Sequence, residues 1–204
     1  MKTNLLICGT AIAAAMLLTF GSCGRSEKNQ SEKTTLEVIH SRKSVRHYTD
    51  GKVTDEQLLT LAKAGMAAPS AKNAQPWQIM AVTDRAKLDS LGTALPYTKM
   101  IFDAPAALVV CGDMTLALEG VSRDYWVQDC SAVTQNILLA AEAIGLGAVW
   151  NGIYPVTERV KDVRRILSLP EYIIPLSVIV VGEPAGVETP KVKWDEKKYH
   201  INEW

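Results

Sequence analysis

A continuously apolar segment at residues 106–111 is the feature that most narrows what this chain can fold into. A short apolar run without polar alternation is typical of a strand that other elements cover on both faces. A longer strand, dominated by Ile and Val, is predicted at 173–182, and two further strands at 77–83 and 148–151. The sequence therefore predicts a sheet with a strand buried on both sides.

The helix predictions depend on capping residues and on apolar side chains that recur every three or four residues. The longest helix is expected at about 121–144, and its core-facing stripe comprises Trp126, Cys130, Val133, Ile137, Ala141 and Ile144. Shorter helices are expected to begin at Thr34 and at Thr54, each with a capping box, and at Asp84 and Pro155.

The order of these elements favours the α+β class. Helices and strands do not alternate strictly, and no glycine-rich turn follows the first strand, so a doubly wound dinucleotide-binding fold is disfavoured. The chain has 204 residues, of which 48% are apolar and 22% charged. That composition suits one globular domain and excludes a disordered or fibrous chain.

Residues 1–22 are predicted to be a secretory signal. Lys2 precedes an apolar run at 5–20, which is shorter than the roughly 20 residues that span a membrane comfortably. Cys23 follows two small residues and resembles the lipid-bearing cysteine of bacterial lipoproteins. The alternative is an ordinary signal peptide, or an uncleaved anchor, with Cys23 incidental.

Residues 23–33 are predicted to be a lipidated tether, because 24–33 contain no apolar side chain that could bury surface. The folded domain is then expected at 34–204. The mature chain is expected to be exported and anchored in a membrane through lipid on Cys23, facing the periplasm or the cell surface.

Charge and cysteine content exclude several other classes. Lys and Arg number 22 and Asp and Glu number 22, so no global field attracts nucleic acid, and no nucleic-acid partner is expected. Cys111 and Cys130 are predicted to be buried free thiols, although export permits a disulfide between them. The histidines are scattered and no Cys/His spacing suits a metal, so no metal site is expected.

Three cations and a hydroxyl fall within five residues, at Arg42, Lys43, Ser44 and Arg46. Guanidinium groups bind phosphate through paired hydrogen bonds, and a hydroxyl adds another donor. Such a cluster can hold a phosphate or another polyanion. Taken alone, a basic pentamer is also typical of a solvated surface patch.

Two further segments combine small and polar residues at the ends of predicted strands. The connector at 67–77 contains two prolines that restrict its path, so Ser70, Asn73 and Gln75 can be held rigidly. Amides donate and accept hydrogen bonds, which suits the edge of a flavin ring, but they also satisfy backbone groups in a stiff connector. The glycines of segment 143–152 allow a planar ligand to approach closely, or simply end a helix in a tight turn.

Together, in this order, the three segments resemble the nitroreductase family of flavoenzymes. The family begins with Arg-x-Ser-x-Arg, which Arg42, Ser44 and Arg46 match. It continues with Pro-Ser-x-x-Asn-x-Gln-Pro-Trp, found here at 69–77, and with a helix ending in Gly-Leu-Gly, found at 145–147. The resemblance covers about residues 36–204.

The resemblance implies a central, mostly antiparallel sheet flanked by helices, in an intertwined homodimer that binds FMN at the subunit interface. The cofactor-binding residues that it implies are Arg42, Lys43, Ser44, Arg46, Pro69, Ser70, Asn73, Gln75, Asn151, Gly152, Lys191 and Lys193.

Within that set, Arg42 and Ser44 are implied at the phosphate and ribityl end, and Arg46 at the N1/O2 edge of the ring. Lys193, with Lys191, takes the place of a family arginine on the phosphate. The loop at 69–75 is implied to come from the partner subunit, and Asn151 and Gly152 to face the ring mainly with their backbone.

The implied activity is transfer of a hydride from a reduced donor, NAD(P)H in vitro, through flavin N5 to nitroaromatic, quinone or related small-molecule acceptors. No catalytic side chain is assigned, because solvent can protonate the reduced product. The alternative is an exported flavin-binding lipoprotein with a different redox substrate or with no turnover.

The polar tail at 183–204 carries Trp194, Tyr199, Ile201 and Trp204. Aromatic side chains on a terminal extension favour contact with a surface, which belongs either to another subunit or to the tail's own domain.

Overall fold

The structure is a computed structural model that describes residues 33–204. The expected signal at 1–22, Cys23 and nearly all of the expected tether lie outside the described residues. In the described part of the chain, no helix is both long enough and apolar enough to cross a membrane.

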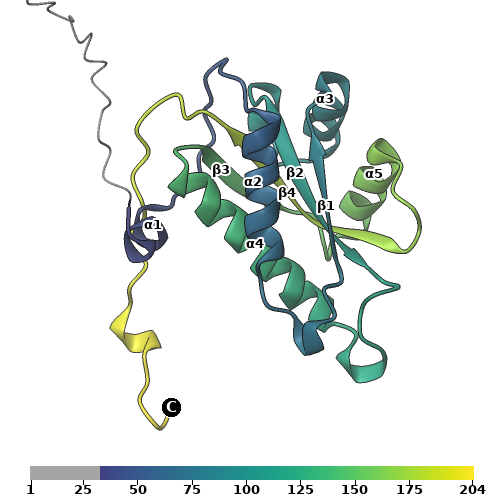
Figure 1. Cartoon of the computed structure of the whole chain (residues 1–204), viewed down its shortest axis with the longest axis vertical. Helices are drawn as coiled ribbons and strands as arrows, with labels where there is room; N and C mark the ends of the chain where they lie inside the picture. Colours follow the sequence, from purple (N-terminus) through teal and green to yellow (C-terminus); the bar gives the residue numbers. More distant parts are fainter. Residues whose placement is uncertain (1–32) are drawn as a thin grey trace, which may run out of the picture. The chain divides into compact units, whose positions relative to one another are not determined.

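Four strands form a single sheet with the order β1-β2-β4-β3, and every neighbouring pair is antiparallel (Figure 1). The strands are β1 (Trp77–Val82), β2 (Ala106–Asp113), β3 (Gly147–Gly152) and β4 (Ile173–Gly182). All four were predicted, with ends that differ by at most two residues. The central pair, β2 and β4, carries the longest ladder, and both strands are buried along almost their whole length.

Two helices cover each face of the sheet. One core contains the apolar sides of α2 (Asp55–Met66) and α4 (Tyr125–Ala143), and the other contains those of α3 (Arg85–Ala94) and α5 (Thr157–Leu167). Strand β2 contributes alternate residues to the two cores: Leu108 packs with α4, and Val109 lies in the core with α3 and α5. The prediction of a strand buried on both faces is therefore confirmed, as is the α+β class.

The predicted extent of the longest helix was wrong at both ends. A short 3₁₀ turn, Gly120–Ser122, precedes α4, and Gly120 has a φ of +58° that an α-helix does not accommodate. At the other end, Ile144 is 39% exposed rather than buried. It lies after the last helical residue, where Gly145, with a φ of +79°, turns the chain into β3.

Cys111 and Cys130 are buried free thiols, as predicted. The Cys130 thiol lies 3.5 Å from the Cys111 carbonyl oxygen and donates to it. Burial raises the pKa of Cys111 to about 12 and raises that of Cys130 as well. Both groups are therefore protonated at neutral pH and are poor nucleophiles.

The C-terminal tail lies against its own domain only over its first part, where the Ala185 N–H donates to the His47 carbonyl oxygen at 3.0 Å and the Glu188 carboxylate accepts the Arg46 N–H at 3.1 Å. After β4 it passes α1 (Thr35–Ser41) and leaves the helices and the sheet (Figure 1). Trp194 is 71% exposed and Trp204 is fully exposed. The aromatic end of the tail is therefore exposed in the single chain, and its contact with another subunit stays a prediction.

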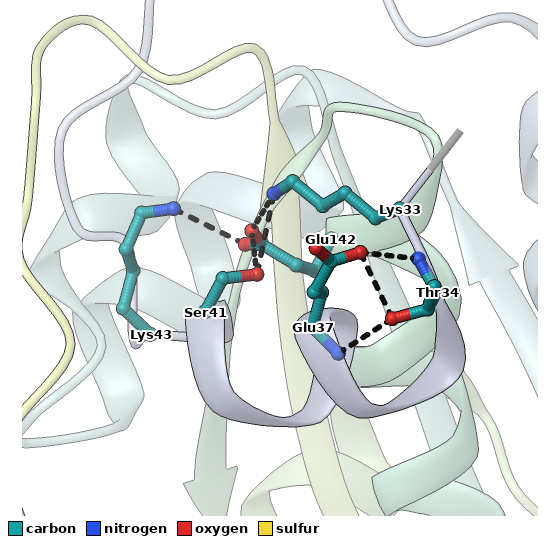
Figure 2. Close-up of polar contacts among 6 residues, drawn as sticks. All are labelled: Lys33, Thr34, Glu37, Ser41, Lys43 and Glu142. Carbon is teal, nitrogen blue, oxygen red and sulfur yellow. Dashed lines mark hydrogen bonds and ion pairs between the residues drawn. The ribbon is translucent and has the colours of Figure 1, made fainter. Parts of the chain in front are cut away.

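A buried carboxylate fixes α1 and the segment after it to the last turn of α4. The Glu142 side chain is only 7% exposed. Its Oε1 accepts hydrogen bonds from Lys33 Nζ at 2.6 Å and from Ser41 Oγ at 2.8 Å, and its Oε2 accepts one from Lys43 Nζ at 3.1 Å (Figure 2). Because Ser41 ends α1 and Lys43 follows it, this cluster fixes the start of the basic segment, which is residues 42–46.

The Glu142 carboxylate is stabilised in its charged form. Burial by itself raises the pKa of Glu142, but the hydrogen bonds from Lys33, Ser41 and Lys43 outweigh burial and lower the pKa below its usual value. A carboxyl group whose pKa is lowered by folding stabilises the fold above its unfolded pKa of about 4.3, and this contribution is lost as the pH falls through the folded value.

Substituting Glu142→Gln is expected to reduce the free energy of unfolding by about 1–3 kcal/mol at pH 7, because two lysines lose their common counter-charge. Denaturant unfolding measures the difference. The difference should begin to shrink as the pH falls below the unfolded pKa of about 4.3, and it should vanish as the pH falls through the lowered pKa of the folded state, where the wild-type carboxyl becomes protonated.

The matched control is Glu158→Gln, which removes an exposed Glu–Lys pair on α5. That pair is solvated, and its loss is expected to cost less than about 0.5 kcal/mol. Equal, small effects of the two substitutions would contradict a structural role for the Glu142 cluster.

Candidate functional site

Six of the residues predicted from the sequence meet in one cavity of about 300 Å³. They come from the basic segment and from the tail, and they are Arg42, Lys43, Ser44, Arg46, Lys191 and Lys193. Thr189 and Glu188 complete the lining. Residues separated by about 150 positions in the sequence therefore form a single cationic site.

Packing determines which side chains of the basic segment face this cavity. Val45 is 2% exposed, and its backbone N–H donates to the Ala148 carbonyl oxygen at 3.1 Å. Gly147 makes this approach possible, since a Cβ there would lie 2.6 Å from Val45 Cγ1. Tyr48 is also buried, and its hydroxyl donates to the carbonyl oxygens of Val45 and Val180. With these two side chains held inward, Ser44 and Arg46 are left at the surface.

The cationic side chains that line this cavity differ in whether they already have a partner within the chain. Lys43 is paired with Glu142, so its role is to hold the segment in place more than to attract a ligand. Within residues 33–204, the guanidinium groups of Arg42 and Arg46 have no hydrogen-bond partner and no carboxylate within ion-pair distance. The one carboxylate in the lining, that of Glu188, accepts the backbone N–H of Arg46 at 3.1 Å. The unpaired guanidinium groups suit an anionic ligand.

A second cavity, of about 560 Å³, adjoins the first through Arg46, which lines both. Asn151 and Gly152 form part of its wall. The Asn151 amide is buried and donates to the Val178 carbonyl oxygen at 3.1 Å, so this side chain is already engaged within the sheet. A Cβ added to Gly152 would meet no atom within 4 Å, which leaves that wall open to a flat ligand.

The amide-rich loop lies elsewhere in the chain. Asn73 and Gln75 have positive φ values of 56° and 49°, which non-glycine residues seldom adopt. Hydrogen bonds maintain this conformation: the Gln75 N–H donates to Ser70 Oγ at 3.0 Å, and the Gln75 amide donates to Asn73 Oδ1 at 3.1 Å. Pro69, Asn73 and Gln75 are exposed. The loop is therefore a rigid set of exposed amides.

Helix α4 keeps this loop away from the cationic cavity of the same chain. The Ala71 N–H donates to Asp129 Oδ1 at 2.9 Å near the start of α4, whereas Lys43 is bound to Glu142 at its end. At about 1.5 Å per residue, these two positions are roughly 20 Å apart along the helix axis. The structure thus brings together the cationic and glycine-containing parts of the predicted set, but not Pro69, Ser70, Asn73 and Gln75.

Sequence reasoning missed several residues that line the larger cavity, among them Tyr97, Trp150 and Arg159. Tyr97 lies in a connection without a strong local pattern. Arg159 lies on a helix rich in charged residues, where one more arginine resembles a solvated side chain. Glu142 was also missed, because its partners at 33, 41 and 43 are about 100 positions away.

In the part of the chain that the structure describes, no group of three or more His, Cys, Asp or Glu side chains is arranged to hold a metal ion.

Comparison with known proteins places these features in a family context. A model described as "Nitroreductase family" matches residues 39–96 and 91–183. A protein of Methanothermobacter thermautotrophicus, proposed to be an NADH dehydrogenase/NAD(P)H nitroreductase, is 42% identical over 174 residues, which make up 85% of this chain and 90% of that protein.

Solved structures show the same likeness. A Bacteroides thetaiotaomicron protein with the same proposed activity is 49% identical, with a TM-score of 0.80 over 84% of this chain and 99% of that one. A proposed nitroreductase from Desulfovibrio desulfuricans, solved in complex with FMN, is 28% identical, with a TM-score of 0.72 over 85% of this chain and 99% of that one.

Proposed function

The chain belongs to the nitroreductase family, and from that premise we propose that it is an FMN-dependent oxidoreductase that takes electrons from NAD(P)H. The observation that carries the proposal is the pair of adjoining cavities that share Arg46. One is small and cationic, and the other is larger and lined by Trp150 and an open Gly152. A phosphate on a flexible chain that ends in a flat ring matches this arrangement.

Each part of FMN has a fitting partner among the described residues. Arg42 and Ser44, with Lys191 and Lys193, would hold the phosphate, and Arg46 would lie between the phosphate end and the ring. The ring would rest against the backbone of Asn151 and Gly152, where no side chain intervenes. The two lysines supply charge without the paired hydrogen bonds of an arginine, so Arg42 is expected to dominate phosphate recognition.

FMN, when bound, supplies the redox chemistry by accepting a hydride from NAD(P)H and passing it to an acceptor. The protein binds and orients the reactants and sets the electrostatics. Reduction leaves negative charge at the N1/O2 edge of the ring, and the Arg46 guanidinium would stabilise that charge. No side chain is assigned as acid or base, since water can protonate the reduced product.

Nitroaromatic compounds and quinones are the acceptors that we propose. Both are flat and accept two electrons, and the larger cavity has a size suited to a ring-shaped substrate stacked on a cofactor. The alternative is a flavin-binding lipoprotein with another redox substrate or with no turnover. A yellow protein that bleaches with NADH and regains its colour with a quinone supports the enzyme over this alternative.

The complete site is proposed to form in a homodimer. The loop bearing Asn73 and Gln75 is rigid and exposed but lies at the wrong end of α4 to reach the cavities of its own chain. A twin chain would bring its loop against them. The exposed aromatic tail would cover the surface of the same partner.

We further propose that this domain is exported and held at a membrane by lipid on Cys23. The sequence at 1–33 is the support for this proposal. An exported location leaves the physiological electron donor open, because nicotinamide cofactors are cytosolic, although NAD(P)H can serve in vitro.

Replacing Cys23→Ser in the full-length chain is expected to move the protein from the membrane fraction to the soluble or secreted fraction of a lipoprotein-processing bacterium. Cys111→Ser, at a buried thiol, is the matched control and should leave the location unchanged. Membrane association that persists in the Cys23 variant would contradict lipid anchoring.

Arg46→Ala is expected to weaken FMN binding about tenfold, because charge-assisted contacts are lost, and to lower the flavin reduction potential by tens of millivolts. Fluorescence titration and spectroelectrochemistry measure the two effects. Arg165→Ala, at an exposed arginine paired with Asp162 on α5, is the control. An unchanged potential in the Arg46 variant would rule out its role at the ring.

Mixed dimers test the shared site. One chain carries Arg42→Glu and the other carries Asn73→Ala with Gln75→Ala, so that each homodimer has two damaged sites. The heterodimer, isolated with two different tags, contains one site built from undamaged parts and is expected to retain about half of the wild-type FMN. Retention no better than that of either homodimer would show that both parts come from one chain.

A further inference from the structure

The larger cavity contains an arginine that FMN binding does not use. Three cationic side chains line it, Arg46, Lys99 and Arg159, and no carboxylate does. Arg46 is assigned to the flavin. The Lys99 ammonium donates to the Gly92 carbonyl oxygen at 3.0 Å and lies 5.5 Å from the centre of the Phe102 ring. It is a compact charge without the planar fork of N–H groups that matches a carboxylate. Arg159 remains.

Two contacts hold the Arg159 guanidinium at the cavity wall. Its Nη1 donates to the Gly152 carbonyl oxygen at 3.0 Å, and its Cζ lies 5.7 Å from the centre of the Tyr97 ring. Within residues 33–204, no carboxylate lies within ion-pair distance of this group. Because the contact with Gly152 uses only one N–H group, the remaining N–H groups of this planar guanidinium are available to bind a carboxylate.

Resting on the proposed function, we propose that Arg159, positioned by Tyr97, selects acceptors that carry an anionic group on the reacting ring, such as aromatic carboxylates. The guanidinium donates a hydrogen bond to the backbone carbonyl of Gly152, and Gly152 forms part of the wall against which the flavin ring would lie. An acceptor stacked on that ring would therefore place a carboxylate at its edge within reach of the fork. Tyr97 is 76% exposed and offers its ring as a further flat contact.

The acceptor fits this position better than the nicotinamide donor does. In NAD(P)H the phosphates are separated from the nicotinamide ring by a ribose. A carboxylate bonded directly to an aromatic ring has no such spacer. The short distance from Arg159 to the ring wall therefore favours a charge on the reacting ring itself.

The test uses 4-nitrobenzoate and its neutral counterpart 4-nitrobenzamide. In the two-electron reaction, a hydride from NADH and a proton from the buffer convert the nitro group to a nitroso group and one molecule of water, with NAD⁺ as the other product. Reduced enzyme is mixed with each acceptor without oxygen, and the ratio of second-order rate constants, anion over amide, is measured. Arg159→Gln is expected to lower this ratio about tenfold, the size expected when a charged hydrogen bond is lost. Tyr97→Leu should lower it about threefold.

The control is Arg165→Gln, which removes the same charge from the same helix outside the cavity and should leave the ratio unchanged. Calorimetric binding of the unreactive pair 4-methylbenzoate and 4-methylbenzamide to the oxidised holoenzyme gives a readout that does not depend on turnover. The Arg159→Gln substitution should weaken the binding of 4-methylbenzoate and leave the binding of 4-methylbenzamide unchanged.

Three results would overturn the proposal: an unchanged ratio in Arg159→Gln, an equal fall in Arg165→Gln, or a loss confined to the step in which NADPH reduces the flavin, measured against an uncharged dihydronicotinamide. Failure of the proposed function is distinct from these, because a wild-type protein without flavin would reduce neither acceptor.

Discussion

Helix α4 is the constraint on which the account of the site depends. Near the start of this helix, Asp129 binds the amide loop, and near its end, Glu142 binds the basic segment. Because about 20 Å of helix separates these contacts, one chain cannot close both parts around the same ligand. In the proposed homodimer, the loop of one chain would complete the site of the other.

Both parts are organised before any ligand arrives. Val45 and Tyr48 are buried, so the basic segment can present Ser44 and Arg46 in only one direction. The amide loop maintains positive φ values at Asn73 and Gln75, conformations that cost free energy and persist only where neighbouring contacts enforce them. A ligand that meets fixed donors loses less binding free energy to ordering than one that must arrange them. This explains why strain and unpaired guanidinium groups occur in the same segments that the family motifs mark.

Much of the fold could be predicted from the sequence because the signals are local. The capping boxes of Thr34 and Thr54 and the apolar strands at 106–111 and 173–182 each act within a few residues, and all were confirmed. The basic segment lines one cavity with Lys191 and Lys193, and Gly152 lines the adjoining cavity, but their assignment to an FMN site stays a prediction. The predictions that were wrong or missing depend on the tertiary structure. Ile144 was expected in the core because its spacing fits the apolar stripe, but α4 ends before it. Glu142 and Arg159 acquire their roles only from partners distant in the sequence or from a cavity that the fold creates.

The central claim, that two chains jointly hold each FMN, is tested most directly by native mass spectrometry of the flavin-saturated protein. The account predicts dimers with two FMN molecules and monomers with none, and loss of the flavin when the dimer is diluted apart. A monomer that retains one FMN, or a folded dimer that retains none in excess FMN, would contradict it.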